Sequence, residues 1–299
     1  MSDAAHNPSP AAPRVSIVVA TYNSLTYLQG LLASIAVYTP QDRYELIVVD
    51  NASTDETAQW CLYAPLGIHL ILNHENRGFA AAANAGAALA KGEFLLFCNP
   101  DVRWTSPVAD RLMEFMEAHP SCGLAAARLT FPDRRFQPSC RNFPTFTNIW
   151  FSRGSILSRL ANPAAGAFQY TLGDFEHSAR VDAVAATCVL IRRKVFTELG
   201  GFDERFFLFA EDTDLCRRSN EAGYETWYVP AASAIHHWGG SSRDHRSVAR
   251  HHAQSIARYF KKHYPRARMR NLLLSLILFV AGRLSGSARF KARSGNASS

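Results

Sequence analysis

The chain has 299 residues, of which 47% are hydrophobic and 19% charged, so a substantial core is possible and a globally disordered chain is excluded. This length suits one large α/β domain with an appendage, or two modest domains. The six cysteines form no Cys-x-x-Cys pair, which argues against a disulfide framework and a zinc site and is typical of reduced, packed thiols in a cytoplasmic protein.

The net charge of +7 is concentrated near the C-terminus. Residues 243–299 carry 13 Lys or Arg and one acid, Asp244, whereas the remaining chain holds 19 basic and 24 acidic residues. Residues 1–13 are rich in Ala, Pro and Ser and have neither the basic nor the apolar part of a signal peptide. We therefore predict a flexible leader over 1–13, a folded domain over 14–242 and a basic, partly apolar helical region over 243–299.

Strand-like and helix-like segments alternate along the folded region, which predicts an α/β fold with a mostly parallel sheet. Short apolar runs predict strands over 15–20, 45–49, 68–72, 94–97, 124–129 and 184–191. Helices are predicted from the apolar stripe Leu28, Leu31, Leu32 and Ile35, from the capping-box pattern Ser53-x-x-Glu56, and over 78–90. Residues 131–180 have no clean period and receive no assignment.

Polar residues follow three of the predicted strands, as Thr21-Tyr22-Asn23, Asp50-Asn51 and Asn99-Pro100-Asp101. The carboxyl ends of parallel strands lie along one edge of a sheet, so these tips are expected to form a single crevice. No Gly-x-Gly-x-x-Gly follows the first strand and no P-loop motif occurs, which disfavours a Rossmann dehydrogenase and a P-loop enzyme. A divalent cation on Asp101 could neutralise a bound diphosphate instead. The alternative is that these acids are turn or cap residues.

Four segments in combination resemble family 2 glycosyltransferases of the GT-A fold, and most closely their bacterial rhamnosyltransferase-like branch. The segments are VSIVVATYNS, ELIVVDNASTD, NRGFAAAANAGAALAKGEFLLFCNPDV and GGFDERFFLFAEDTDLCRRSNEAGYETWYVPAASAIHHWGGSS, and together they cover residues 15–242. The resemblance implies a Rossmann-like, mostly parallel sheet flanked by helices, followed here by the basic helical extension. It also implies a sugar transfer that inverts the anomeric centre.

The resemblance further implies roles for individual residues. Binding of the donor and its nucleotide is implied for Thr21, Tyr22, Asn23, Asp50, Asn51, Asn76, Gly78, Asn84 and Asn99. Asp101 and His237 are implied to hold Mg²⁺ or Mn²⁺, His237 matching the family position better than His236, and Asp212 is implied as the general base beside Glu211. The chain departs from the family at Asn99, where many relatives carry an acid, and at Ala185-Ala186, where they carry a Gly-Ala pair.

The expected function is therefore the transfer of a sugar from a nucleoside-diphosphate sugar, with dTDP-rhamnose favoured, to a saccharide or polyprenyl-linked acceptor in bacterial cell-surface polysaccharide synthesis. One alternative is a catalytically inactive relative that binds nucleotide and anchors an assembly at a membrane. Another is a nucleic-acid-binding protein recruited through the basic tail, which the apolar run within that tail argues against.

That apolar run, residues 272–281, predicts peripheral association with the anionic inner face of the cytoplasmic membrane. As a helix it would extend ~15 Å, about half of the ~30 Å hydrocarbon core, so it is too short to cross. Arginines on both sides suit anionic lipid headgroups. The other interpretation is a helix that packs on the catalytic domain or on a second subunit of a homodimer.

Overall fold

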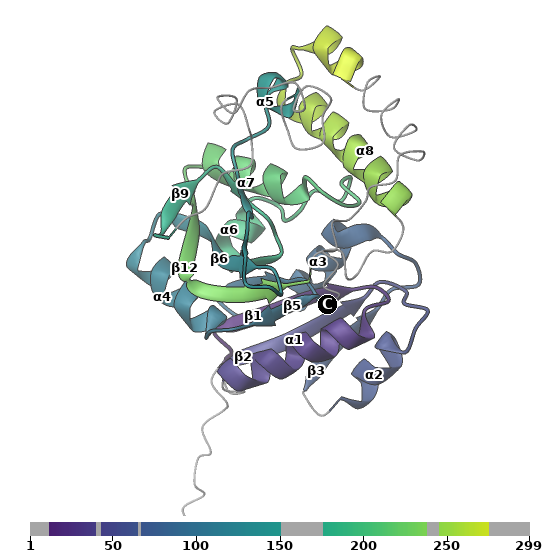
Figure 1. Cartoon of the computed structure of the whole chain (residues 1–299), viewed down its shortest axis with the longest axis vertical. Helices are drawn as coiled ribbons and strands as arrows, with labels where there is room; N and C mark the ends of the chain where they lie inside the picture. The colour runs from purple at the N-terminus through teal and green to yellow at the C-terminus, as the bar shows by residue number, and fades with distance from the viewer. Residues whose placement is uncertain (1–11, 40–42, 65–66, 151–175, 238–244, 275–299) are drawn as a thin grey trace, which may run out of the picture.

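A mixed β-sheet with helices on both faces forms the centre of the molecule (Figure 1). The structure is a computed structural model that describes residues 12–39, 43–64, 67–150, 176–237 and 245–274. Its strands are β1 (Val15–Thr21), β2 (Tyr44–Asp50), β3 (Ile68–Leu72), β4 (Phe94–Cys98), β5 (Val102–Trp104), β6 (Cys122–Thr130), β7 (Phe136–Gln137), β8 (Cys140–Arg141), β9 (Ala179–Val181), β10 (Ala183–Val184), β11 (Cys188–Arg192) and β12 (Glu225–His236). Its helices are α1 (Leu25–Tyr38), α2 (Thr57–Tyr63), α3 (Gly78–Leu89), α4 (Val108–Ala118), α5 (Phe146–Trp150), α6 (Arg193–Glu198), α7 (Glu211–Glu221) and α8 (His245–His263).

The first four strands of the chain form the parallel half of the sheet, in the order β3-β2-β1-β4. The apolar runs of β1, β2 and β4 are buried on both faces because helices cover each side, whereas the edge strand β3 is only partly buried. Side chains of α1, α2 and α4 pack in one hydrophobic cluster with Ile17, Val48 and Leu96. Those of α3, α6 and α7 pack in a second cluster with Val18 and Phe97. The predicted α/β architecture is thus confirmed.

Antiparallel pairing enters in the second half of the sheet, beyond the predicted alternation. Strand β11 runs antiparallel between β4 and β6, and β12 then lies parallel to β6. The short strand β5 pairs antiparallel with the end of β12, so that His236 lies opposite Val102. This pairing brings the end of β12 to the segment that follows β4, which carries Asp101.

One local prediction differs from the structure, and one unassigned stretch gains elements. Helix α2 begins at Thr57 and not at the predicted capping box, because the hydroxyl of Ser53 instead accepts a hydrogen bond from the backbone N–H of Asn23 at 2.9 Å. The carboxylate of Asp55 accepts the N–H of Thr57 at 3.0 Å and takes over the capping role. Within the unassigned stretch, the described residues form β7, β8, α5 and β9.

Helix α8 packs against α7 and the segment before it, although the sequence places α8 in the basic C-terminal region. Ile256, Tyr259 and Phe260 of α8 share a hydrophobic cluster with Phe206 and Leu274.

The six cysteines are buried and free, as predicted.

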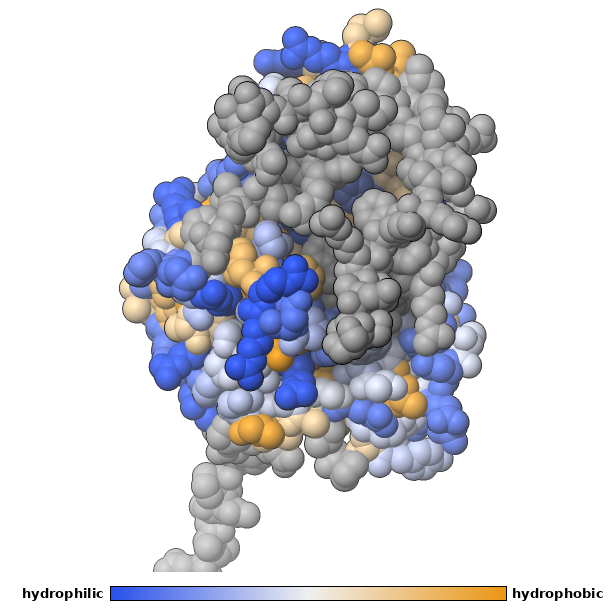
Figure 2. Space-filling view, in the orientation of Figure 1, coloured by the Kyte–Doolittle hydropathy of each residue, from blue (hydrophilic) through white to orange (hydrophobic). Residues whose placement is uncertain are grey.

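A short helical segment at residues 268–274 follows α8. Its Leu274 is buried, while Met269, Leu272 and Leu273 are 79%, 65% and 55% exposed. Figure 2 shows hydrophobic and hydrophilic surface side by side at the top of the molecule, where this segment lies in Figure 1. No helix within the described ranges has the length and apolar character needed to span a bilayer. Most of the predicted apolar run, residues 275–281, lies outside the described residues.

Candidate active site

The tips of β1 and β2 present two buried polar groups at paired positions. Thr21 and Asp50 are register partners, and both side chains are 2% exposed. One carboxylate oxygen of Asp50, Oδ2, accepts the backbone N–H of Ser53 at 2.9 Å. The other, Oδ1, and the hydroxyl of Thr21 have no hydrogen-bond partner in the described part of the chain. Buried polar atoms of this kind are normally satisfied, so both are candidates to bind a ligand.

Asn23 links the ends of β1 and β2. Its backbone is left-handed, with φ of 49°, a conformation that asparagine tolerates better than most residues. Its side-chain oxygen accepts the backbone N–H of Thr54 at 2.7 Å and of Asp55 at 3.3 Å. Asn23 thus holds the two tips together, while the neighbouring Tyr22 leaves its ring 39% exposed at the same edge.

Asn51 holds the loop before α3 in place through side-chain hydrogen bonds. Its amide donates to Asn76 Oδ1 and to the carbonyl of Gly78, each at 3.1 Å. Its oxygen accepts from the side chain of Asn73 at 2.9 Å and from the N–H of Arg77 at 3.2 Å. Asn51 and Asn76 therefore act on this loop through contacts within the protein.

Gly78 and Asn84 join α3 to the segment of residues 201–207. Gly78 has φ of +82°, and a Cβ there would lie 2.2 Å from the carbonyl oxygen of Phe207, so only glycine fits. The Asn84 amide donates to the carbonyl of Phe202 at 2.8 Å, and its oxygen accepts the N–H of Phe202 at 2.9 Å. Asn84 also donates to Glu204 at 3.1 Å. The predicted donor-side element is thus clamped to the segment that leads into α7.

Asp101 lies after β4 against His236, the last residue of β12. Asp101 is 2% exposed, and Asn99 before it is half-buried, with its backbone N–H donating to the carbonyl of Thr187. The Nε2 atom of His236 lies 3.3 Å from Asp101 Oδ1. The other ring nitrogen, Nδ1, lies 2.7 Å from Gln137 Oε1. Because an amide oxygen only accepts, Nδ1 donates the hydrogen of this bond, and Nε2 is the ring nitrogen that faces Asp101.

The structure brings His236, and not His237, to the carboxylate of Asp101. The backbone N–H of His237 donates to the carbonyl of Asp101 at 2.9 Å, but its ring lies beside Tyr27, with 5.7 Å between ring centroids. The signal that distinguishes them is the alternation along β12, where Ala232, Ala234 and His236 share the buried face.

These groups fit a divalent cation. Asp101 Oδ1 accepts no hydrogen bond within the described residues, and it converges with an imidazole nitrogen. Oxygen and imidazole ligands suit Mn²⁺, and oxygen ligands suit Mg²⁺. No group of three His, Cys, Asp or Glu side chains able to hold a metal occurs among the residues described. Substrate phosphates and water would therefore complete the coordination, as is usual for Mg²⁺.

Glu211 and Asp212 begin α7, after a left-handed turn at Phe209 and Ala210. Both carboxylates are buried at the N-terminal end of α7, where the helix dipole favours negative charge. Asp212 accepts from Arg141 Nη1 at 3.2 Å and from the N–H of Thr213 at 2.6 Å. Asp212 is thus oriented by β8 and by its own helix.

Glu211, the neighbour of Asp212, is kept in its protonated form. Burial, and secondly the charge of Asp212, raise the pKa of Glu211 to about 8. Glu211 is therefore mostly neutral at pH 7. A neutral acid is a poor proton acceptor, which leaves Asp212 as the better candidate of the two.

Arg141 and His252 are two further residues near Asp212 that the sequence analysis did not identify. Arg141 lies in the stretch without a period, where no pattern singles it out. His252 of α8 packs edge-on against Phe209, and burial, then the charge of Arg141, lower its pKa. Its position follows from the packing of α8, which local sequence patterns do not predict.

The sheet topology and its match to solved structures define a GT-A fold. The family profile described as "Glycosyl transferase family 2" matches residues 16–200. The chain therefore belongs to glycosyl transferase family 2, as its resemblance implied. The profile ends before Glu211, Asp212 and His236, which lie in the remainder of the chain.

Curated relatives place the chain in the rhamnosyltransferase-like branch. It is 31% identical over 255 residues to the N-acetylglucosaminyl-diphospho-decaprenol L-rhamnosyltransferase of Mycobacterium tuberculosis, covering 79% of this chain and 80% of the relative. It is 28% identical over 259 residues to rhamnosyltransferase WbbL of Escherichia coli K12, covering 83% and 93%.

Solved structures share the GT-A fold. The mannosyltransferase PcManGT of Pyrobaculum calidifontis, in complex with GDP-Man and Mn²⁺, matches with a TM-score of 0.58 and 20% identity over 94% of this chain and 78% of its own. TarS residues 1–349 of S. aureus, in complex with UDP-GlcNAc, match with a TM-score of 0.56 and 17% identity over 91% and 81%.

Proposed function

We propose that this glycosyltransferase is a metal-dependent, inverting rhamnosyltransferase of bacterial cell-surface polysaccharide synthesis. Its donor is a nucleoside-diphosphate sugar, with dTDP-rhamnose the first candidate, and its acceptor is a saccharide or polyprenyl-linked saccharide. The names of the M. tuberculosis and E. coli relatives support the sugar, and the first of these supports a lipid-diphosphate acceptor. The observation that carries the proposal is the set of buried carboxylate oxygens of Asp50 and Asp101 that no hydrogen bond uses in the described chain.

At the donor end, Asp50 Oδ1 accepts the ring N–H of the nucleotide base, and Thr21 supplies a neighbouring hydroxyl. Asn23, Asn51 and Asn76 hold the surrounding loops in place, as their internal hydrogen bonds support. Tyr22 offers a partly exposed ring at the same edge, where a base can stack.

Near the diphosphate, Asp101 and His236 would hold Mg²⁺ or Mn²⁺, and His237 keeps the adjoining backbone in place through its N–H. A bound divalent ion supplies Lewis-acid stabilisation of charge on the departing nucleoside diphosphate. Many relatives carry an acid at the position of Asn99, so Asp101 is the carboxylate that remains in the segment after β4.

At the acceptor end, Asp212 takes the proton of the attacking hydroxyl. Arg141 and the N–H of Thr213 orient its carboxylate, and neutral Glu211 avoids a second buried charge beside it. A single displacement without a covalent intermediate inverts the anomeric centre.

Ligand-induced stabilisation tests the donor assignment directly. Thermal unfolding is followed with UDP, dTDP or GDP, each with Mg²⁺ or Mn²⁺, because a ligand that binds only the folded state raises the melting temperature. dTDP is expected to give the largest shift, and turnover of dTDP-rhamnose is then measured with N-acetylglucosamine linked through diphosphate to a short polyprenyl chain. Nucleotide binding without any sugar transfer would instead indicate an inactive scaffold.

Membrane association accompanies this acceptor. In the described part of the C-terminal region, Met269, Leu272 and Leu273 are exposed beside Arg266, Arg268 and Arg270. Apolar side chains flanked by arginines suit an anionic membrane surface. We therefore propose a cytoplasmic protein that binds the inner face of the cytoplasmic membrane peripherally.

A further inference from the structure

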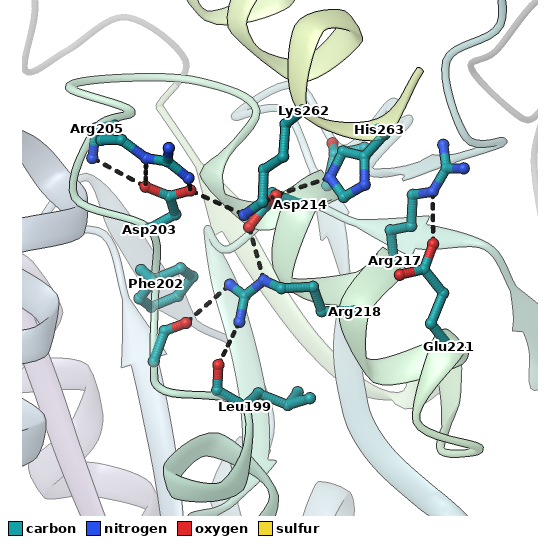
Figure 3. A network of polar contacts seen from close by, with 12 residues as sticks. Leu199, Phe202, Asp203, Arg205, Asp214, Arg217, Arg218, Glu221, Lys262 and His263 are labelled. Atoms are coloured by element: carbon teal, nitrogen blue, oxygen red, sulfur yellow. Dashed lines mark hydrogen bonds and ion pairs between the residues drawn. The ribbon is translucent and has the colours of Figure 1, made fainter. Parts of the chain in front are cut away.

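A buried carboxylate that the proposed chemistry does not use lies one turn into α7. Asp214 is fully buried, two residues after Asp212. Its Oδ2 accepts from Arg218 Nε at 2.8 Å, and its Oδ1 accepts from Lys262 Nζ at 2.6 Å and His263 Nε2 at 2.8 Å. Two of these three partners belong to α8, so α8 supplies much of the charge that compensates Asp214 (Figure 3).

The same partners extend toward the donor side. Arg218 also donates to the carbonyls of Leu199 and Gly201, at 2.6 and 2.8 Å. Lys262 also donates to Asp203 at 2.8 Å. The 199–203 segment therefore contacts α7 through Arg218 and α8 through Lys262 (Figure 3).

That segment is joined in turn to the donor-side helix α3. Asn84 binds both backbone groups of Phe202, and Arg77 pairs with Glu204 at 3.3 Å. A continuous set of polar contacts thus runs from the loop and helix beside the nucleotide crevice, through residues 202–204, to α8 and the start of α7.

We propose that α8 is part of the catalytic apparatus and that Lys262 and His263 are positioning residues, which act through Asp214 to hold the base helix against the donor-side segment. This inference rests on the proposed role of Asp212. The reacting groups of donor and acceptor must be held in one precise relative position, because a misplacement of ~1 Å can cost ~10²-fold in rate. Removing an α8 cation also leaves the buried charge of Asp214 undercompensated, which favours a shift of α7.

The test compares two neighbouring lysines in the full-length protein. Lys262→Met removes the contact with Asp214, and Lys261→Met removes an exposed lysine next to it. Turnover is measured well below the melting temperature, with the folded fraction checked by circular dichroism, and dTDP affinity with Mn²⁺ is measured by calorimetry. We expect Lys262→Met to lower kcat ~10- to 100-fold while dTDP affinity changes less than about 3-fold, and Lys261→Met to resemble the parent.

Two further comparisons separate positioning from simple stabilisation. Lys262→Arg keeps the charge and is expected to retain most of the parental kcat. The double variant Asp214→Asn with Lys262→Met is expected to have a kcat no lower than that of the worse single variant, because both changes remove the same contact. If Lys262→Met does not fold, His263→Gln and His263→Leu replace it, since only glutamine can still donate to Asp214. A lower kcat in His263→Leu, with a near-parental kcat in His263→Gln, supports the proposal.

A folded Lys262→Met or His263→Leu protein with parental kcat would overturn the proposal and leave α8 a purely stabilising helix. This outcome is distinct from failure of the proposed base. If Asp212→Asn kept normal turnover, Asp212 would be excluded whatever the lysine variants did.

Discussion

Glu211 is a carboxylic acid that the protein keeps protonated at neutral pH. Its side chain is buried, Oε2 has no hydrogen-bond partner among the described residues, and its pKa is raised to about 8. An unfolded glutamate ionises near pH 4.3, so between these values the folded state binds a proton that the unfolded state has lost. The contribution of this group to stability is present below about pH 4 and is lost as the pH rises toward 8.

Replacing Glu211 by glutamine should therefore change how stability depends on pH. Glu211→Gln cannot ionise, so its free energy of unfolding should gain on that of the parent by up to ~1.4 kcal/mol per pH unit between about pH 5 and 8. Denaturant titrations at a series of pH values measure this difference. Glu221→Gln, an exposed position at the other end of α7, is the control, and an identical pH dependence for both variants would contradict the argument.

Asp212 is the residue whose loss should stop catalysis most selectively. Asp212→Asn keeps the size of the side chain but removes the proton acceptor, so kcat should fall ~10²- to 10⁴-fold while dTDP still binds. Steady-state kinetics and calorimetry measure the two effects, with Glu221→Gln again as the control. Near-normal turnover would exclude Asp212 as the base.

The paired histidines provide a direct comparison at the proposed metal site. Asp101→Ala and His236→Ala should each weaken Mn²⁺-dependent binding of dTDP, whereas His237→Ala should have the smaller effect because its ring lies beside Tyr27. The Mn²⁺ affinity of each variant is measured by electron paramagnetic resonance. A larger loss in His237→Ala would return the ligand role to that residue, and full activity in exhaustively chelated enzyme would exclude the metal.

Among the elements, the parallel strands could be predicted well and the antiparallel additions could not. The runs that became β1, β2 and β4 are apolar throughout because each is buried on both faces, and this pattern is visible locally. The tips after them were expected to share an edge, and the register of Thr21 with Asp50 confirms this for β1 and β2. Strand β11 is equally apolar, but its direction depends on a partner far along the chain, which no local pattern specifies.

The site shows the same division. Asp50 and Asp101 follow strands and are found from local order. By contrast, Arg141 of β8 binds Asp212, and His252 of α8 packs against Phe209 close by. Those two contacts depend on how distant elements pack. Sequence order therefore identified the residues at the strand tips more completely than those around Asp212.

The segment at residues 268–274 should bind anionic lipid through its exposed face. The double substitution Leu272→Ser and Leu273→Ser removes two exposed leucines while Leu274 stays buried, so sedimentation with anionic liposomes should fall. High salt should weaken the binding of the parent, because arginines contribute up to ~1 kcal/mol each near such a surface. Leu89→Ser, at an exposed leucine of α3, is the control.

Truncation after Arg270 extends this test to the remaining apolar run and should release the protein from the same liposomes. If the truncated, substituted and parental proteins all sediment equally, the region serves the fold or a subunit interface instead of the membrane.

For the whole molecule, the packing of α8 on the catalytic domain is the feature that sequence order predicts least. In the sequence, the basic residues 243–299 look separate from the acidic remainder of the chain. In space, however, part of this positive charge compensates a buried acid of α7, as Lys262 does for Asp214. The division of charge along the chain therefore reflects, in part, complementary surfaces that meet in the folded protein.

The placement of β11 between β4 and β6 has a consequence for synthesis of the chain. Residues through β4 leave the ribosome well before β11, and β4 has β1 as a partner on one edge only until then. The nascent protein thus carries an apolar strand with an open edge, the feature that promotes association between chains. Translation speed and chaperone access between residues 98 and 188 should consequently govern how much of this transferase reaches its native state.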